Sequence, residues 1–85
     1  MKWYTLSAEQ GDADAQSNLG VMFGKGKGVL QDNIYAHMWF NISASLGGEN
    51  ASYNRELIAE RMTPADISKA QQLARECVAK DYKRC

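Results

Sequence analysis

Apolar residues recur along this chain at helical spacing, in segments that glycines and a single proline separate. Between residues 12 and 23 they fall at i, i+4, i+7 and i+8, on one helical face: Ala15, Leu19, Met22 and Phe23. Val, Ile and Thr are scattered, and no alternating run of useful length is found. The pattern therefore predicts an all-α chain of about five helices.

The helix boundaries follow from residues that start or end helices. We expect helices over residues 2–10, 12–23, 33–45, 50–62 and 64–81. Gly11, the glycine cluster at 24–28 and the pair at 47–48 are expected to interrupt them. Asp32 or Asn33 is expected to cap the third helix. The sharpest start is at Thr63-Pro64, where Thr63 suits the N-cap and Pro64 the first helical position.

The same periodicity predicts which residues are buried. The third helix is expected to bury Tyr35, Ala36, Trp39, Phe40 and Ser43 or Ala44; the fourth Ala51, Asn54, Ile58 and Met62; the fifth Ile67, Ala70, Leu73, Ala74, Cys77 and Val78. Small residues recur where helices are expected to cross, at Ala8, Gly20, Ala36 and Ala44.

The chain also repeats itself at a spacing of 36 residues. The matching pairs are Trp3-Tyr4 with Trp39-Phe40, Ser7-Ala8 with Ser43-Ala44, Gly11 with Gly47, Ala15 with Ala51, and Asn18 with Asn54. A period between about 20 and 50 residues is typical of stacked-repeat proteins. Such proteins work through an extended surface, so the repeat favours binding over catalysis.

The segment from Trp3 to Asp32 resembles the Sel-one-like repeat family, a relative of the tetratricopeptide repeats. Its Leu19-Gly20 pair and Phe23 match the Leu-Gly-x-x-Tyr element of those repeats. Residues 62–74 resemble the C-terminal ending common in the family. The resemblance implies a right-handed helix-hairpin solenoid, an α/α superhelix, that serves as an adaptor or scaffold for a protein or peptide partner.

In the frame of that repeat, the chain divides into three parts. Residues 1–11 are expected to be the second helix of a preceding repeat, residues 12–47 a full repeat, and residues 48–85 a divergent capping repeat. Arg55 and Glu56 take the places of Leu19 and Gly20 in that last part. Polar substitution of this kind is typical of a terminal cap.

Two surfaces are candidates for partner binding. The unpaired first helix should leave part of Trp3, Tyr4 and Leu6 uncovered, which favours self-association by end-to-end packing or helix exchange. On the concave face, Gln16 and Ser17 are candidates for ligand contact. Gln16 has the alternative of bonding to a neighbouring loop.

The repeated asparagines Asn18 and Asn54 have two interpretations. An amide donates and accepts hydrogen bonds together, so these residues are suited to binding a peptide backbone. The alternative, which we favour, is that they satisfy buried backbone groups.

Charge and motifs exclude several other classes. The 85 residues carry 10 basic and 10 acidic side chains, which argues against a nucleic-acid partner. No apolar run approaches the ~18 residues of a membrane span, and the first residues lack the apolar segment of a signal peptide. The glycines at 20–26 do not match a phosphate loop, so no cofactor is expected.

Candidate catalytic and metal-binding residues are few. His37 is the single histidine, is expected on a solvated helix face, and has no zinc-ligand spacing to the cysteines. With no nucleophile beside a base, the chain is not expected to be an enzyme. The alternative is a hydrolase, because cysteine-rich relatives in the resembled family include members that bind or hydrolyse β-lactams.

Cys77 and Cys85 are either a disulfide or two free thiols. A continuous helix would separate them by about 12 Å, whereas a disulfide tolerates about 7 Å between Cα atoms. A bond therefore requires the helix to end near Asp81 and the tail to fold back. Cysteine-rich relatives also place seven residues between paired cysteines. A disulfide would imply a periplasmic or secreted parent protein; a natural start at Met1 would imply the cytoplasm.

Overall fold

The computed structural model describes the backbone of residues 2–85 and the side chains of residues 3–85. Met1, where the predicted half repeat begins, lies outside the described residues. Five helices follow one another: α1 Lys2–Glu9, α2 Ala13–Lys25, α3 Asn33–Ser45, α4 Ala51–Ala59 and α5 Pro64–Ala79. The described residues contain no strand, so the predicted all-α class with five helices is confirmed.

The helices start where side chains can accept hydrogen bonds from free backbone amides. Asp12 Oδ1 accepts from the amides of Asp14 and Ala15 at 2.9 and 3.2 Å. Asp32 caps α3 in the same way, at 2.9 and 3.1 Å. Thr63 Oγ1 accepts from the amide of Asp66 at 3.1 Å, and Pro64 is the first residue of α5. The predicted caps at Asp32 and Thr63 are therefore confirmed.

Three helix ends differ from the prediction by two or more residues. α2 continues through Gly24 to Lys25, and Gly26 caps it in the left-handed conformation (φ 71°) that its missing side chain allows. The prediction that Gly24 ends the helix is wrong, because the left-handed turn falls at Gly26, whose amide donates to the Met22 carbonyl. α4 and α5 end at Ala59 and Ala79, each before the predicted residue, and α4 closes in a tight turn.

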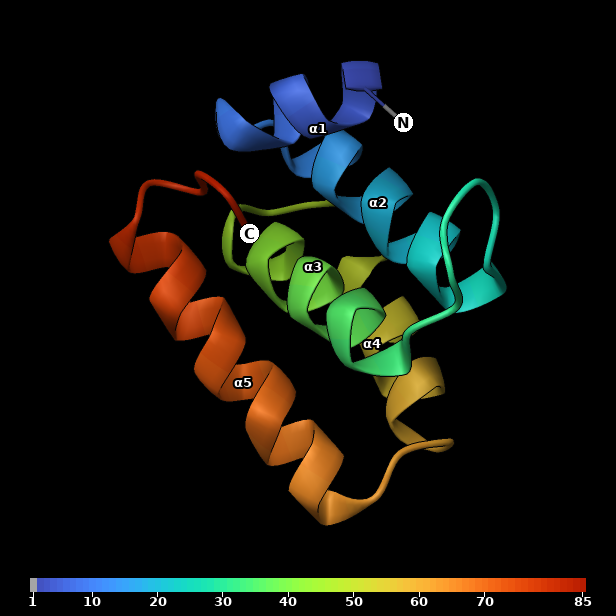
Figure 1. The fold of residues 1–85 in the computed structure, drawn as a ribbon. Coiled ribbons are helices and arrows are strands. Elements are labelled where there is room, and N and C mark those ends of the chain that lie inside the picture. Colours follow the sequence, from blue (N-terminus) through green and yellow to red (C-terminus); the bar gives the residue numbers. More distant parts are fainter. Residues whose placement is uncertain (1) are drawn as a thin grey trace.

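α3 is the centre of the fold. Figure 1 shows α2 on one side of α3, α5 on the other and α4 behind it, with α1 lying across the end of α2. A helix with neighbours on several sides is buried around most of its circumference. Seven residues of α3 are buried: Ala36, His37, Met38, Trp39, Phe40, Ile42 and Ser43.

The burial predicted from the sequence is wrong at positions on α3 and on α5. Met38, His37 and Ile42 lie off the predicted stripe of α3, yet they are buried because more than one face of α3 is covered. Conversely, Val78 of α5 is 46% exposed, although it was assigned to the packing face. The face that α5 buries carries Ala70, Ala74 and Cys77.

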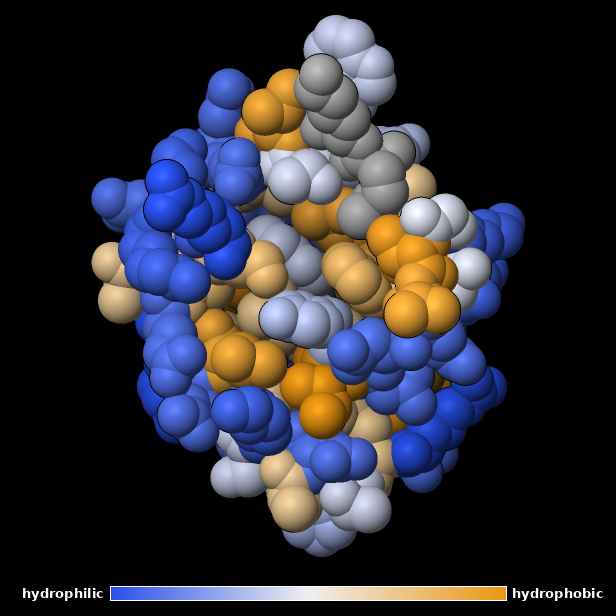
Figure 2. Space-filling model, viewed as in Figure 1, coloured by the Kyte–Doolittle hydropathy of each residue, from blue (hydrophilic) through white to orange (hydrophobic). Residues whose placement is uncertain are grey.

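The core consists of two clusters. The larger one joins residues of α1, α2, α3 and α5 and includes Ala8, Leu19 and Trp39. The smaller one joins Ala36 and Phe40 of α3 to Ile58 of α4. Figure 2 shows apolar residues gathered over the middle of the face that α3 and α5 present, with hydrophilic residues along both margins.

Candidate functional site

A groove lies between α2 and α4, over the smaller core cluster. Its volume is about 530 Å³. Both helices contribute to its walls, and α3 contributes one residue to its floor. The lining residues are Gly20, Val21, Gly24, Lys25, Phe40, Asn54, Leu57, Ile58, Glu60 and Arg61.

The floor of the groove is apolar and closely packed. Phe40 and Ile58 are 3% and 9% exposed. A Cβ atom at Gly20 would lie 2.6 Å from the Phe40 ring, so only glycine lets the ring approach α2 this closely. Gly24, one turn further along α2, leaves similar room beside Ile58. Because these two glycines have no side chains, Phe40 and Ile58 can lie close to α2, and the groove remains open above them.

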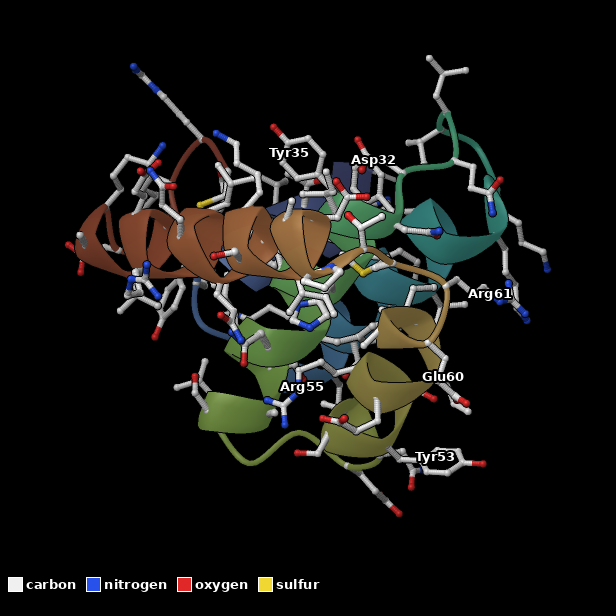
Figure 3. All side chains as sticks on the ribbon, turned by 90° about the horizontal axis from the view of Figure 1, so that it is seen from below. Asp32, Tyr35, Tyr53, Arg55, Glu60 and Arg61 are labelled. Atoms are coloured by element: carbon white, nitrogen blue, oxygen red, sulfur yellow. A yellow bond between two sulfur atoms is a disulfide. The ribbon has the colours of Figure 1, made fainter. Side chains whose placement is uncertain are left out.

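The rim of the groove is polar. Leu57 is 45% exposed, and beside it stand Lys25, Glu60 and Arg61, none of which forms an ion pair within residues 3–85. Figure 3 shows Glu60 and Arg61 in the turn that follows α4, with their side chains directed outward, while Arg55 points toward α3. The groove thus combines an apolar floor with free charges, of which two are basic and one is acidic.

His37 lies in the interface between α3 and α4 and is 3% exposed. The prediction of a solvated His37 is wrong because α4 covers this side of α3. Burial lowers the pKa of the imidazole, the nearby Arg55 guanidinium lowers it further, and Glu56 acts in the opposite direction. Its Nδ1 atom has no hydrogen-bond partner within the described residues.

Arg55 is held by its own partners beside that histidine. Its Nη1 donates to Asn41 Oδ1 at 2.9 Å, and its Nε lies 3.3 Å from Glu56 Oε1. Within residues 3–85, no group of three His, Cys, Asp or Glu side chains is placed to hold a metal ion. We find no hydrogen bond there that joins a Ser or Cys side chain to His37, the arrangement that would activate a nucleophile.

The residues predicted to contact ligand on α2 are internal instead. Gln16 is fully buried, and its Nε2 donates to the Ala8 carbonyl at 3.1 Å. Ser43 Oγ donates to the Ala13 carbonyl at 2.7 Å, and Ser17 Oγ lies 2.8 Å from Ser43 Oγ. Gln16 is buried and Ser17 half-buried, and these hydrogen bonds join α2 to α1 and α3, so the structure does not present the two residues as the ligand contacts predicted on the concave face.

The exposed end of the molecule is α1. Trp3, Tyr4 and Leu6 are 82%, 40% and 46% exposed. Their equivalents one repeat later, Trp39, Phe40 and Ile42, are 4%, 3% and 1% exposed. The same residue types are covered in α3 because α3 has neighbours that α1 lacks.

The two cysteines form a disulfide, with Cα atoms 5.6 Å apart. α5 ends at Ala79, and the tail turns back so that Cys85 reaches Cys77. In Figure 1 this tail lies beside the C-terminal end of α1.

The helix-hairpin order, the 36-residue repeat and the apolar groove define this chain as a helical-repeat protein. The Sel1 repeat family model matches residues 1–12 and 13–48, more than half of the chain. The chain therefore belongs to the Sel1 repeat family, whose repeats form helical solenoids and are generally non-enzymatic protein-interaction modules. No curated protein matches the sequence. Within the described residues, no helix is both long and apolar enough to cross a membrane.

Proposed function

We propose that this chain is an interaction module that binds a segment of a partner protein in the groove between α2 and α4. The observation that carries the proposal is a groove with a closely packed apolar floor, Phe40 and Ile58, beside Leu57, which is 45% exposed. A large apolar side chain that enters the groove and covers Leu57 would remove this apolar surface from water, which is favourable. The unpaired charges of the rim would orient the bound segment by attracting its charged side chains.

The charges of the rim indicate the chemistry of that segment. Lys25 and Arg61 line the groove together with Glu60, so basic groups outnumber acidic ones at the rim. We propose a peptide segment in which an apolar anchor is flanked by an acidic residue. Gly20 supports the apolar floor of this groove, since the absence of a side chain lets the Phe40 ring lie against α2.

Selection of random peptides displayed on phage tests this proposal. Enriched peptides should combine a large apolar residue with Asp or Glu. Leu57→Arg should weaken their binding at least ~10-fold, which corresponds to about 1.4 kcal/mol. Val78→Arg is the matched control, because Val78 on α5 is exposed to the same extent (46% against 45%) but lies outside the groove. Equal loss in both variants, or no enriched peptide, would contradict the proposal.

We also propose that two copies of the chain associate through the exposed end of α1. The support is the exposure of Trp3, Tyr4 and Leu6, which form an apolar surface on one short helix. Molar mass from light scattering behind a sizing column should be that of a dimer for the natural chain. Trp3→Asp should give a monomer, and a natural chain that is already monomeric would refute this association.

The division of the chain into repeats is a further proposal. We propose that residues 1–11 form half a repeat, residues 12–47 a full repeat and residues 48–85 a C-terminal cap. The support for the cap is the polar pair Arg55 and Glu56 on α4, at the positions of Leu19 and Gly20 on α2. We propose no catalytic activity, and a chromogenic β-lactam should show no turnover above buffer.

A further inference from the structure

The last six residues form a tail whose backbone is unusual. Asp81, Tyr82 and Arg84 have φ values of 54°, 65° and 57°, in the left-handed region that side chains with a Cβ atom avoid. Residues in such conformations persist where the surrounding structure holds them. The contacts that hold this tail therefore decide whether it keeps its shape.

Besides backbone hydrogen bonds to the last turn of α5, the tail has noncovalent contacts with the C-terminal end of α1. Lys83 Nζ donates to the Glu9 carbonyl at 2.9 Å, and the Arg84 amide donates to Glu9 Oε2 at 3.1 Å. The lysine ammonium thus neutralises the negative end of the α1 dipole. Tyr82 packs on the larger core cluster and approaches Gly11, the residue that joins α1 to α2.

The covalent contact is the disulfide between Cys77 and Cys85. Cys77 is 1% exposed, at the end of the packing face of α5, whereas Cys85 is half-buried. The two polar contacts to Glu9 are exposed to water, where such contacts stabilise little. The disulfide is therefore the strongest restraint on the strained tail.

The contacts of α1 make this restraint important beyond the tail. α1 is only eight residues long, which is too short to be a stable helix by itself. It packs on α2, and the tail holds its last residue. Releasing the tail would remove the restraint from the C-terminal end of the helix that exposes Trp3, Tyr4 and Leu6.

We propose that the Cys77–Cys85 disulfide is a redox-sensitive latch that anchors α1 through the tail. Its consequence for association rests on the function proposed above for the α1 end. A dithiol reductant attacks the more accessible Cys85 sulfur as a thiolate, and Cys77 leaves as a thiolate. The second thiol of the reductant then releases Cys85. Two electrons and two protons reach the protein, and the reductant becomes a cyclic disulfide.

Hydrogen exchange of the whole chain, with and without dithiothreitol, tests the latch. Intact mass, which rises by two protons, verifies complete reduction. We expect at least ~10-fold faster amide exchange in the tail and in α1 after reduction, because local opening sets the exchange of such segments. Amides in the middle of α3 and at Ala70–Ala74 of α5 should keep their rates.

Two results would overturn the latch. Unchanged exchange in α1 after full reduction would mean that the tail does not anchor this helix. Equally faster exchange in every helix would mean that the disulfide maintains the whole fold. The double variant Cys77→Ser, Cys85→Ser should reproduce the reduced protein without reductant, and failure to do so also counts against the latch.

Light scattering on the same samples separates the latch from the proposed association. If the latch and the association are both present, the dimerisation constant from a concentration series should fall at least ~3-fold on reduction, which corresponds to about 0.7 kcal/mol. A monomer in both redox states would overturn the association alone. The exchange rates of α1 would still decide the latch.

Discussion

The imidazole of His37 lies in surroundings that oppose its protonation. Burial and the Arg55 guanidinium both disfavour the charged form, and Glu56 favours it. The folded-state pKa is therefore below the ordinary value of 6.5. When the pH falls through that value, the unfolded chain takes up a proton that the folded chain does not.

The lowered pKa of His37 gives a prediction for the stability of the protein in acid. The free energy of unfolding should decrease as the pH falls below 6.5, and it should stop decreasing, as far as His37 is concerned, below the folded-state pKa. Urea unfolding at a series of pH values measures this dependence. His37→Gln removes the titrating group, so its stability should vary less between neutral pH and pH 5 than that of the natural chain. Equal slopes in both proteins would show that other groups are responsible.

Gly20 and Gly24 are a matched pair one turn apart on α2. Gly20→Ala places a methyl group against the Phe40 ring, and such overpacking costs about 1–3 kcal/mol. Replacing a helical glycine by alanine gains about 0.5–1 kcal/mol, so the net effect at Gly20 should be destabilising. Gly24→Ala meets the end of the flexible Ile58 side chain at 3.3 Å and Ala36 Cβ at an ordinary contact distance of 3.7 Å, so it should be neutral or stabilising. Urea midpoints that rank the two variants in the opposite order would refute this packing argument.

At the scale of the element, each helix depends on its ends and on one buried face. α5 is the longest helix, and it begins with the Thr63 cap and ends at the tail. α3 differs from the others because helices cover several of its faces, so some of its polar residues are buried. His37 Nδ1 has no hydrogen-bond partner within the described residues, whereas Ser43 has one, the Ala13 carbonyl.

The Thr63 cap gives a prediction for α5. Thr63→Ala removes the hydroxyl that accepts from the Asp66 amide, and loss of such a cap costs about 1 kcal/mol. Ser68→Ala is the control, because Ser68 is exposed within the same helix and alanine is the better helix former. Thermal unfolding followed by circular dichroism should show a lower midpoint for Thr63→Ala and no decrease for Ser68→Ala.

At the scale of the whole molecule, position in the stack decides what a residue contributes. Trp3 and Trp39 occupy the same place in successive repeats, but one is 82% and the other 4% exposed. The internal helix is covered by neighbours on several sides, and the terminal helix is not. Identical residues therefore contribute to folding in one repeat and remain available for contact in the other.

The two tryptophans make this difference measurable. Trp39→Ala should lower the free energy of unfolding by about 3–5 kcal/mol, as expected for a large buried aromatic residue. Trp3→Ala should change it by no more than about 0.5 kcal/mol, the usual range for an exposed residue. Both are measured by urea unfolding at a protein concentration at which the chain is monomeric. A large loss for Trp3→Ala would contradict the exposed position of this residue.

Local chemistry alone was enough to predict the helices of this chain and much of its core. Capping at Asp32 and Thr63, the glycine at residue 11 and the 3.6-residue periodicity act over a few residues, so they can be recognised without the fold. The exposure of Trp3, Tyr4 and Leu6 was also predicted, because the repeat frame led us to interpret residues 2–10 as a helix without its hairpin partner.

Tertiary structure decided what depends on contacts between distant segments. His37 and Gln16 are polar and lie inside because α4 and α1 cover them, which no local pattern indicates. The groove exists because α2 and α4 lie near each other in the fold. The sequence signals for it were Gly20 and Gly24, but we had interpreted Gly20 as a packing residue and Gly24 as a helix break. The tail reaches α1 across 74 residues of sequence, between Lys83 and Glu9. Periodicity and caps are local properties of the chain, whereas burial and grooves belong to the assembled helices.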